Sequence, residues 1–191
     1  MRYMFYKASA FRGDLSAWDV SRVTDLYHTF NRAESFDGDL SSWNVHRVTN
    51  MEQTFFGAAS FRGGALPWNT SGVTSMYATF YKASSFTGDI SSWDTSRVAN
   101  MESMFYAAAA FNGDVTMWDV SGLVRVRNMF SGAASFARAL CWNMGSVVDY
   151  DPSNVSSTAK KACDLSTMTI YACVLLLFGL FDASCLPAWL A

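Results

Sequence analysis

The sequence predicts an α/β repeat solenoid of the leucine-rich-repeat type, in which each coil contributes one short strand and one short helix around a parallel sheet. Five tryptophans recur every 25 residues and a sixth follows after 24, while two phenylalanine rows and one alanine row keep the same interval. A unit of this length cannot bury its own apolar side chains, so we expect the units to stack and share one core. The rows are Trp18, Trp43, Trp68, Trp93, Trp118 and Trp142; Phe5, Phe30, Phe55, Phe80, Phe105 and Phe130; Phe11, Phe36, Phe61, Phe86, Phe111 and Phe136; and Ala8, Ala33, Ala58, Ala83, Ala108 and Ala133.

The strand of each unit is predicted directly after the tryptophan. Val20 lies two residues beyond Trp18, and a step of two apolar positions is typical of extended chain. Equivalent strands of successive units would then pair in parallel. A turn is predicted before each tryptophan, at a glycine that usually precedes an aspartate. These glycines are Gly13, Gly38, Gly63, Gly88 and Gly113.

The helix of each unit is predicted from a change in spacing. Leu26, Phe30 and Ala33 follow one another at steps of four and three, which places them on one face of a helix of about two turns. Thr49 and Glu52 match a capping box and indicate a helix start in the third unit. The alanine row has a steric explanation in this scheme, because a small side chain lets the helix approach the strand layer.

Composition excludes two broad classes. The chain has 191 residues, of which 51% are hydrophobic and 16% charged, with a net charge of −2. Disordered proteins have lower hydrophobicity and a larger charge imbalance. Nucleic-acid binding is not predicted either, because a sequence pI near 5.6 provides no general excess of positive charge.

Two stretches carry a resemblance to a known family. Residues 101–120 read MESMFYAAAAFNGDVTMWDV and residues 86–100 read FTGDISSWDTSRVAN. They resemble the 25-residue repeat of BspA-like leucine-rich-repeat surface proteins, which also occurs in mycoplasma lipoproteins. The resemblance covers residues 1 to about 150 and implies an adhesion or interaction scaffold at a cell surface, without catalytic residues. Gly64, Ala65 and Pro67 depart from the pattern, so we expect the third coil to be locally irregular.

The polar residues predict no enzyme, cofactor or metal site. His28 and His46 occupy variable positions of the repeat and are expected to be solvated surface side chains. A stacked acid row could bind Ca²⁺, which would relieve the repulsion between its carboxylates. We expect instead that each aspartate accepts backbone N–H bonds in its own turn. The acid row is Asp14, Asp39, Asp89 and Asp114.

An aromatic slot of the repeat is the predicted partner-facing surface. Tyr6, Phe56, Tyr81 and Tyr106 share this slot, outside the rows assigned to the core. Exposed aromatic side chains in a row can anchor a protein partner. The alternative is that these rings pack against the neighbouring coils.

The chain is divided into three parts. Residues 1–150 form the six-copy solenoid, residues 151–164 a polar connector, and residues 165–191 an apolar C-terminal helix. The uncharged run from Leu165 to Phe181 is at the lower length limit for crossing a bilayer. Three interpretations stay open: a membrane anchor, a helix that caps the solenoid, and a glycolipid-anchor signal.

The signals for localisation conflict. The chain starts inside a repeat without a signal peptide, which indicates a cytoplasmic protein or a fragment that lacks upstream coils. Lys160 and Lys161 precede the apolar run, and the positive-inside tendency would place the repeats in the cytoplasm. Asn69 and Asn154 begin glycosylation sequons and would carry glycans if the chain is secreted.

The predicted function is a non-enzymatic repeat scaffold that binds a protein or a surface glycan, with adhesion at a cell surface or membrane as its setting. The alternative is an intracellular protein-interaction module that its C-terminal apolar segment tethers to a membrane. No cofactor is predicted for either function.

Overall fold

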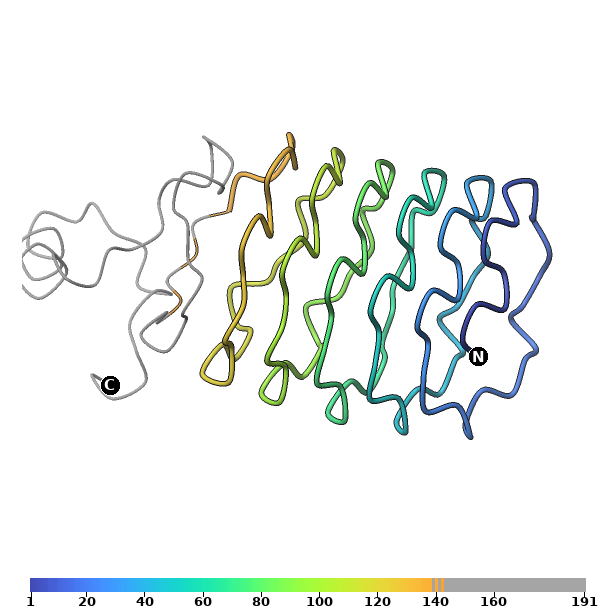
Figure 1. Ribbon diagram of the computed structural model, residues 1–191, viewed down its shortest axis with the longest axis horizontal. Helices are drawn as coiled ribbons and strands as arrows, with labels where there is room; N and C mark the ends of the chain where they lie inside the picture. The colour runs from blue at the N-terminus through green and yellow to red at the C-terminus, as the bar shows by residue number, and fades with distance from the viewer. Residues whose placement is uncertain (139, 141, 143–191) are drawn as a thin grey trace, which may run out of the picture.

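The protein is a stack of coils that repeat every 25 residues. The structure is a computed structural model and describes residues 1–138, 140 and 142. We number the coils 1 to 6, beginning at Met1, Leu26, Met51, Met76, Met101 and Val126. Figure 1 shows them side by side along the long axis, from the blue first coil to the orange part of coil 6.

The prediction of one helix and one strand per coil is wrong. Across residues 1–138, 140 and 142 there is no helix, and the chain forms isolated parallel β-bridges instead of strands. Four of these bridges join the last residue of one coil to the last residue of the next. These residues lie several positions beyond the tryptophan, whereas the strand was predicted directly after it. The fold is therefore not an α/β solenoid. The bridges are Asp25 with Asn50, Asn50 with Ser75, Ser75 with Asn100, Asn100 with Arg125, and Ala65 with Asp89.

Tight turns occupy the segment that was predicted to be helical. In coil 2 the Thr29 N–H donates to the Leu26 carbonyl at 3.0 Å, and the Ala33 N–H donates to the Phe30 carbonyl at 3.0 Å. The third residues of these turns, His28 and Arg32, have φ of 55° and 60°. Positive φ at this position defines a type II turn. Successive turns return a side chain to the core every three to four residues, which imitates the spacing of a helix.

Backbone bonds between coils alternate with the bonds inside the turns. His28 N–H donates to Glu52 O at 3.1 Å, Phe30 N–H to Thr54 O at 2.8 Å, and Arg32 N–H to Phe56 O at 2.7 Å. These donors point along the stack, so they cannot bond four residues back as a helix requires. The capping box is also absent, because the Glu52 carboxylate accepts from the Ser75 hydroxyl at 2.7 Å.

Left-handed backbone recurs at two positions of every coil. These are the third and seventh positions, and all have φ between 51° and 73°. Type II turns favour glycine or asparagine there, but most of these positions carry other residues. A left-handed non-glycine residue costs roughly 1 kcal/mol. The residues are Tyr3, Lys7, His28, Arg32, Gln53, Gly57, Ala78, Lys82, Ser103, Ala107, Asn128 and Gly132.

Replacing Ala107 by glycine is therefore expected to stabilise the protein by up to about 0.5 kcal/mol, because the strain of roughly 1 kcal/mol outweighs the roughly 0.5 to 1 kcal/mol of added freedom in the unfolded chain. Ala109→Gly is the matched control, since Ala109 has no positive φ and should only lose stability. Urea denaturation of the two variants beside the wild type measures the difference. Destabilisation by Ala107→Gly would contradict the turn geometry.

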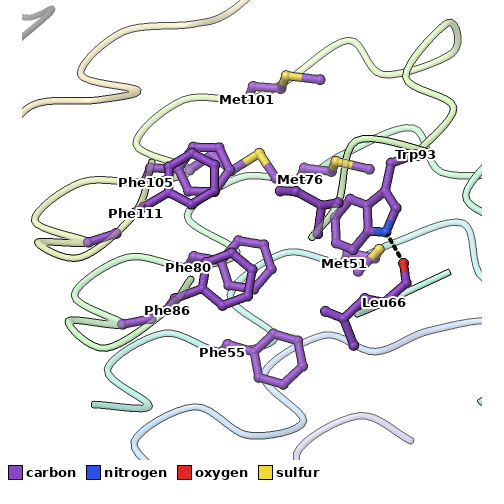
Figure 2. Close-up of a cluster of buried hydrophobic side chains, with 14 of the residues drawn as sticks. Met51, Phe55, Leu66, Met76, Phe80, Phe86, Trp93, Met101, Phe105 and Phe111 are labelled. Carbon is purple, nitrogen blue, oxygen red and sulfur yellow. Dashed lines mark hydrogen bonds between the residues drawn. The ribbon is translucent and has the colours of Figure 1, made fainter. Parts of the chain in front are cut away.

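The core consists of aromatic rows that run along the stack. The rings of Phe55 and Phe80 are 5.4 Å apart between coils, and those of Phe80 and Phe86 are 3.8 Å apart within coil 4. In Figure 2 the rings of Phe105 and Phe111 overlap, and those of Phe80 and Phe86 overlap below them. From coil 2 onward, the alanine, phenylalanine and tryptophan rows are buried. The shared core makes each coil depend on its neighbours.

Each buried indole has a backbone partner. The Trp93 Nε1–H donates to the Leu66 carbonyl at 2.9 Å, as Figure 2 shows, and the Trp68 Nε1–H donates to Leu40 O at 2.9 Å. Such a bond offsets the cost of burying a polar N–H. Coil 1 differs because its ring has no preceding coil in the structure, and Trp18 is 42% exposed.

The third coil is irregular, as its sequence predicts. Gly63 and Gly64 have φ of 86° and 57°, which adds two left-handed residues where other coils have none. The additional bridge between Ala65 and Asp89 follows directly. A side chain at Gly63 would also meet the ring of Phe86, because a Cβ atom there lies 2.5 Å from its Cε2.

Candidate functional site

Three of the four predicted partner-facing aromatics form one stack on the outside of coils 3 to 5. The rings of Phe56 and Tyr81 are 4.4 Å apart with an interplanar angle of 5°, and those of Tyr81 and Tyr106 are 4.7 Å apart at 8°. All three are partly buried. We call these three residues the aromatic row. These rings were predicted either to face a partner or to pack against the neighbouring coils. They do pack against one another between coils, but part of each ring stays exposed.

The turn geometry explains why the aromatic row points away from the core. Phe55 begins a turn and is fully buried, Phe56 and Gly57 are its two central residues, and Ala58 completes it inside the core. The Ala58 N–H donates to the Phe55 carbonyl at 3.1 Å. The two central residues of this turn lie between two core positions, so in coils 3 to 5 the aromatic slot reaches the surface.

Tyr6 does not join the row. Its slot is occupied in coil 2 by Asn31, which is 3% exposed and donates from Nδ2 to Gln53 Oε1 at 3.1 Å. Tyr6 lies beside Tyr3, with ring centroids 5.5 Å apart, in an edge-to-face arrangement. Asn31 therefore divides the predicted four-residue surface into the aromatic row and a separate N-terminal cluster.

The N-terminal cluster surrounds His28 with the predicted Tyr6 and with two tyrosines that were not predicted as site residues, Tyr3 and Tyr27. The His28 ring is 5.0 Å from that of Tyr3, 4.1 Å from that of Tyr27 and 5.8 Å from that of Tyr6. Tyr27 occupies the second position of its coil, whereas Tyr3 and His28 occupy the third. Tyr27 and His28 are the two central residues of the turn that begins at Leu26. Only the turn geometry brings the two slots together, so sequence spacing alone gave no signal for Tyr3 and Tyr27.

The prediction that His28 is a solvated side chain is wrong. Its Nε2 atom is buried and has no hydrogen-bond partner among the described residues. Burial lowers the pKa of His28, with Glu52 raising it and Arg2 lowering it to a lesser extent. His46 is exposed as expected, and its Nδ1 atom lies 2.8 Å from Asn44 Oδ1.

The acid row closes turns, as expected. Oδ1 of each aspartate accepts the backbone N–H two residues later, at 2.9 Å for Asp14, 2.8 Å for Asp39, and 3.0 Å for both Asp89 and Asp114. A second row, directly after the tryptophans, does the same, and Asp94 accepts from Ser96 N–H at 3.0 Å; its aspartates are Asp19, Asp94 and Asp119. The described coils contain no group of three or more His, Cys, Asp or Glu side chains that could hold a metal ion.

These bonds lower the pKa values of the aspartates in both rows, which we call the corner aspartates because each closes a turn of its coil. For Asp89 the largest cause is the Ser91 backbone N–H, followed by the Ser91 hydroxyl, and both stabilise the carboxylate. For Asp114 the Thr116 hydroxyl contributes most to the lowered pKa, followed by the Thr116 backbone N–H. The charged form of each aspartate thus favours the folded state.

We expect stability to fall in acid for this reason. A carboxyl group whose pKa is lowered by folding contributes stability above its unfolded value of about 3.9 and loses it as the pH falls through the folded value. The thermal midpoint should thus stay level from pH 7 to about pH 5 and then drop. Asp89→Asn with Asp114→Asn should flatten this drop, because asparagine keeps the acceptor and does not titrate. Asn69 already fills such a corner, with Oδ1 accepting from Ser71 N–H at 3.1 Å. An equally steep drop in the variant would contradict the role of these corners.

The remaining predicted site residues fall into two groups. Asn69, the first glycosylation candidate, is exposed. Asn154 and the apolar run from Leu165 to Phe181 lie outside the described residues. Within the coils that the structure describes, no helix is long and apolar enough to span a membrane.

Cations lie beside the aromatic row and the N-terminal cluster. The Lys82 ammonium is 5.4 Å from the centroid of the Tyr81 ring, and the Lys7 ammonium is 5.0 Å from that of Tyr6. Both lysines occupy the seventh position of their coil, directly after the aromatic slot. Arg32 occupies the same position in coil 2 and is exposed.

Comparison with known proteins identifies the family. No curated protein and no solved structure matches the chain. A family model described as "Mycoplasma protein of unknown function, DUF285" matches residues 1–66 and 63–167. This match supports the mycoplasma-type repeat in the resemblance, but not the narrower BspA-like assignment. Because the two matches together span most of the sequence, the chain belongs to the DUF285 family of mycoplasma-type repeat proteins.

Proposed function

We propose that the chain is a non-enzymatic scaffold at a cell surface, and that it binds a protein or a glycan through the aromatic row. The observation that carries the proposal is the stack of Phe56, Tyr81 and Tyr106, whose rings are partly exposed although a complete aromatic core lies beneath them. Aromatic side chains that are held rigidly at a surface are preferred anchors in binding interfaces.

The polar chemistry of the coils supports a non-catalytic role. The corner aspartates accept backbone bonds in their own turns and are thereby committed to closing the coil. His46 has Asn44 as its side-chain neighbour, and His28 is packed among tyrosine rings. A catalytic histidine needs a nucleophile or substrate group within hydrogen-bond reach, whereas the side-chain partners of these histidines in the described coils are asparagines.

The experiment is a binding screen with matched surface variants. The full chain is applied to arrays of immobilised extracellular proteins and of glycans, beside a Phe56→Ser, Tyr81→Ser, Tyr106→Ser variant. The control variant carries Met4→Ser, Met117→Ser and Val124→Ser, which remove exposed apolar side chains outside the aromatic row. Thermal denaturation confirms that each variant folds.

We expect the aromatic-row variant to lose at least about tenfold in affinity for whatever the wild type captures, since each anchor residue is worth more than about 1 kcal/mol. The control should retain binding within about twofold. Equal binding by all three proteins, or no capture by the wild type on either array, would overturn the proposal.

A further inference from the structure

The cross-section of the stack is electrically divided. Through residue 138, positions 1–13 of the coils carry eight basic and four acidic side chains, a net charge of +4, whereas positions 14–25 carry four basic and eight acidic ones, a net charge of −4. The first half contains Arg2, Lys7, Arg12, Arg32, Glu34, Asp37, Glu52, Arg62, Lys82, Glu102, Arg127 and Arg138. The second half contains Asp14, Asp19, Arg22, Asp25, Asp39, Arg47, Asp89, Asp94, Arg97, Asp114, Asp119 and Arg125.

The charges of the basic half are not balanced locally. The ion pairs in the described coils join Arg2 to Asp25 and Arg62 to Asp37. Neither pair involves the three cations next to the aromatic slot, which are all exposed. Lys7, Arg32 and Lys82 therefore face solvent without a carboxylate partner in those coils, while Asp37 is neutralised by Arg62.

The stacking of the aromatic row decides which part of each ring a ligand meets. Neighbouring rings lie 4.4 and 4.7 Å apart and almost parallel, so the faces of Tyr81 are covered by Phe56 and Tyr106. A partner reaches mainly ring edges, which carry the positive end of the ring quadrupole. The C–H edges offer contact to apolar side chains, whereas a sugar ring that stacks on an aromatic face would find both faces of Tyr81 occupied.

We infer that the aromatic row and the cations Lys7, Arg32 and Lys82 together bind an acidic segment of a partner protein. The inference rests on the proposed function and narrows its ligand class. A protein segment combines carboxylates for the cations with apolar side chains for the ring edges, and opposite charges also accelerate and orient such encounters. An anionic polysaccharide supplies charge without apolar side chains and fits only half of this surface.

The test measures binding of a fluorescent glutamate–tyrosine copolymer to the full chain by anisotropy. One variant carries Lys7→Asn, Arg32→Asn and Lys82→Asn; asparagine tolerates the positive φ of these positions. The matched control carries Arg22→Asn, Arg47→Asn and Arg97→Asn, which removes three positive charges from the acidic half. Heparin and phosphatidylserine vesicles are measured in parallel.

We expect the first variant to bind the copolymer at least about tenfold more weakly and the control to change by less than about threefold. Wild-type affinity should fall as salt increases, because the ions screen the exposed charges. If both variants lose the same affinity, only net charge matters and the inference fails. It also fails if heparin or vesicles bind and the copolymer does not.

The two proposals can fail separately. If the copolymer does not bind while the aromatic-row variant still loses an array ligand, the acidic partner is wrong and the scaffold proposal stands. If copolymer binding depends on the three cations and persists in the aromatic-row variant, the aromatic row is not the anchor. Should the cation variant unfold, Lys82→Asn alone is compared with Arg97→Asn.

Discussion

Replacing Trp93 by alanine is expected to lower the free energy of unfolding by about 3 to 5 kcal/mol. The indole is 3% exposed and stacks on Trp68 with a centroid distance of 5.8 Å. Its removal opens a cavity between two coils and leaves the Leu66 carbonyl without its donor (Figure 2). Because neighbouring coils share this core, the loss is not confined to coil 4.

Trp18→Ala is the control for this prediction. The Trp18 ring is 42% exposed, so the same substitution should cost roughly 1 to 2 kcal/mol. At the other end of the row, Trp142 is 8% exposed and its Nε1–H donates to Val115 O at 3.2 Å, so Trp18 is the better control. Urea denaturation followed by circular dichroism compares the variants. Equal losses at Trp93 and Trp18 would contradict the shared core.

The period and the buried rows could be predicted because both depend on side-chain chemistry alone. Phe80, Ala83 and Trp93 recur in register, and a unit of 25 residues cannot hide such side chains without neighbours. The structure buries all three. The exposure of Trp18 in the first coil could not be predicted from the period, because a repeat pattern treats all copies as equivalent.

The helix could not be distinguished from turns by apolar spacing. Both conformations return a side chain to the core after three or four residues, as Leu26, Phe30 and Ala33 do. Glycine at the third and seventh positions of the coils would have indicated turns, but among these positions only Gly57 and Gly132 are glycines. The other coils place ordinary residues there, because the bonds between coils hold the backbone in a conformation that their intrinsic preferences disfavour.

The candidate site was predictable only in part for the same reason. The shared slot of Phe56, Tyr81 and Tyr106 is visible in the sequence, and these rings do come together. Asn31 interrupts the slot, and its burial depends on bonds to side chains from other positions. The tyrosine cluster around His28 joins two slots, which only the turn geometry places side by side.

Replacing Ala83 by leucine is the second change with a large expected effect, a loss of about 2 to 3 kcal/mol. Ala83 is fully buried, its N–H donates to Phe80 O at 3.0 Å, and its carbonyl accepts from Phe86 N–H at 3.1 Å. The rings of Phe80 and Phe86 are 3.8 Å apart, so the segment that joins them has no spare volume. Bonds between coils also fix the spacing along the stack at about 4.8 Å.

The alanine row therefore remains sterically required although the helix that first explained it is absent. A leucine at position 83 must displace the two rings or separate coil 4 from its neighbours, and either change weakens contacts on both sides. Ala109→Leu adds the same atoms at an exposed position and should change stability by less than about 0.5 kcal/mol. Urea midpoints and near-ultraviolet circular dichroism distinguish the two variants. If Ala83→Leu and Ala109→Leu were equally stable, the core around Ala83 would have room for a leucine side chain, which would contradict the close packing described above.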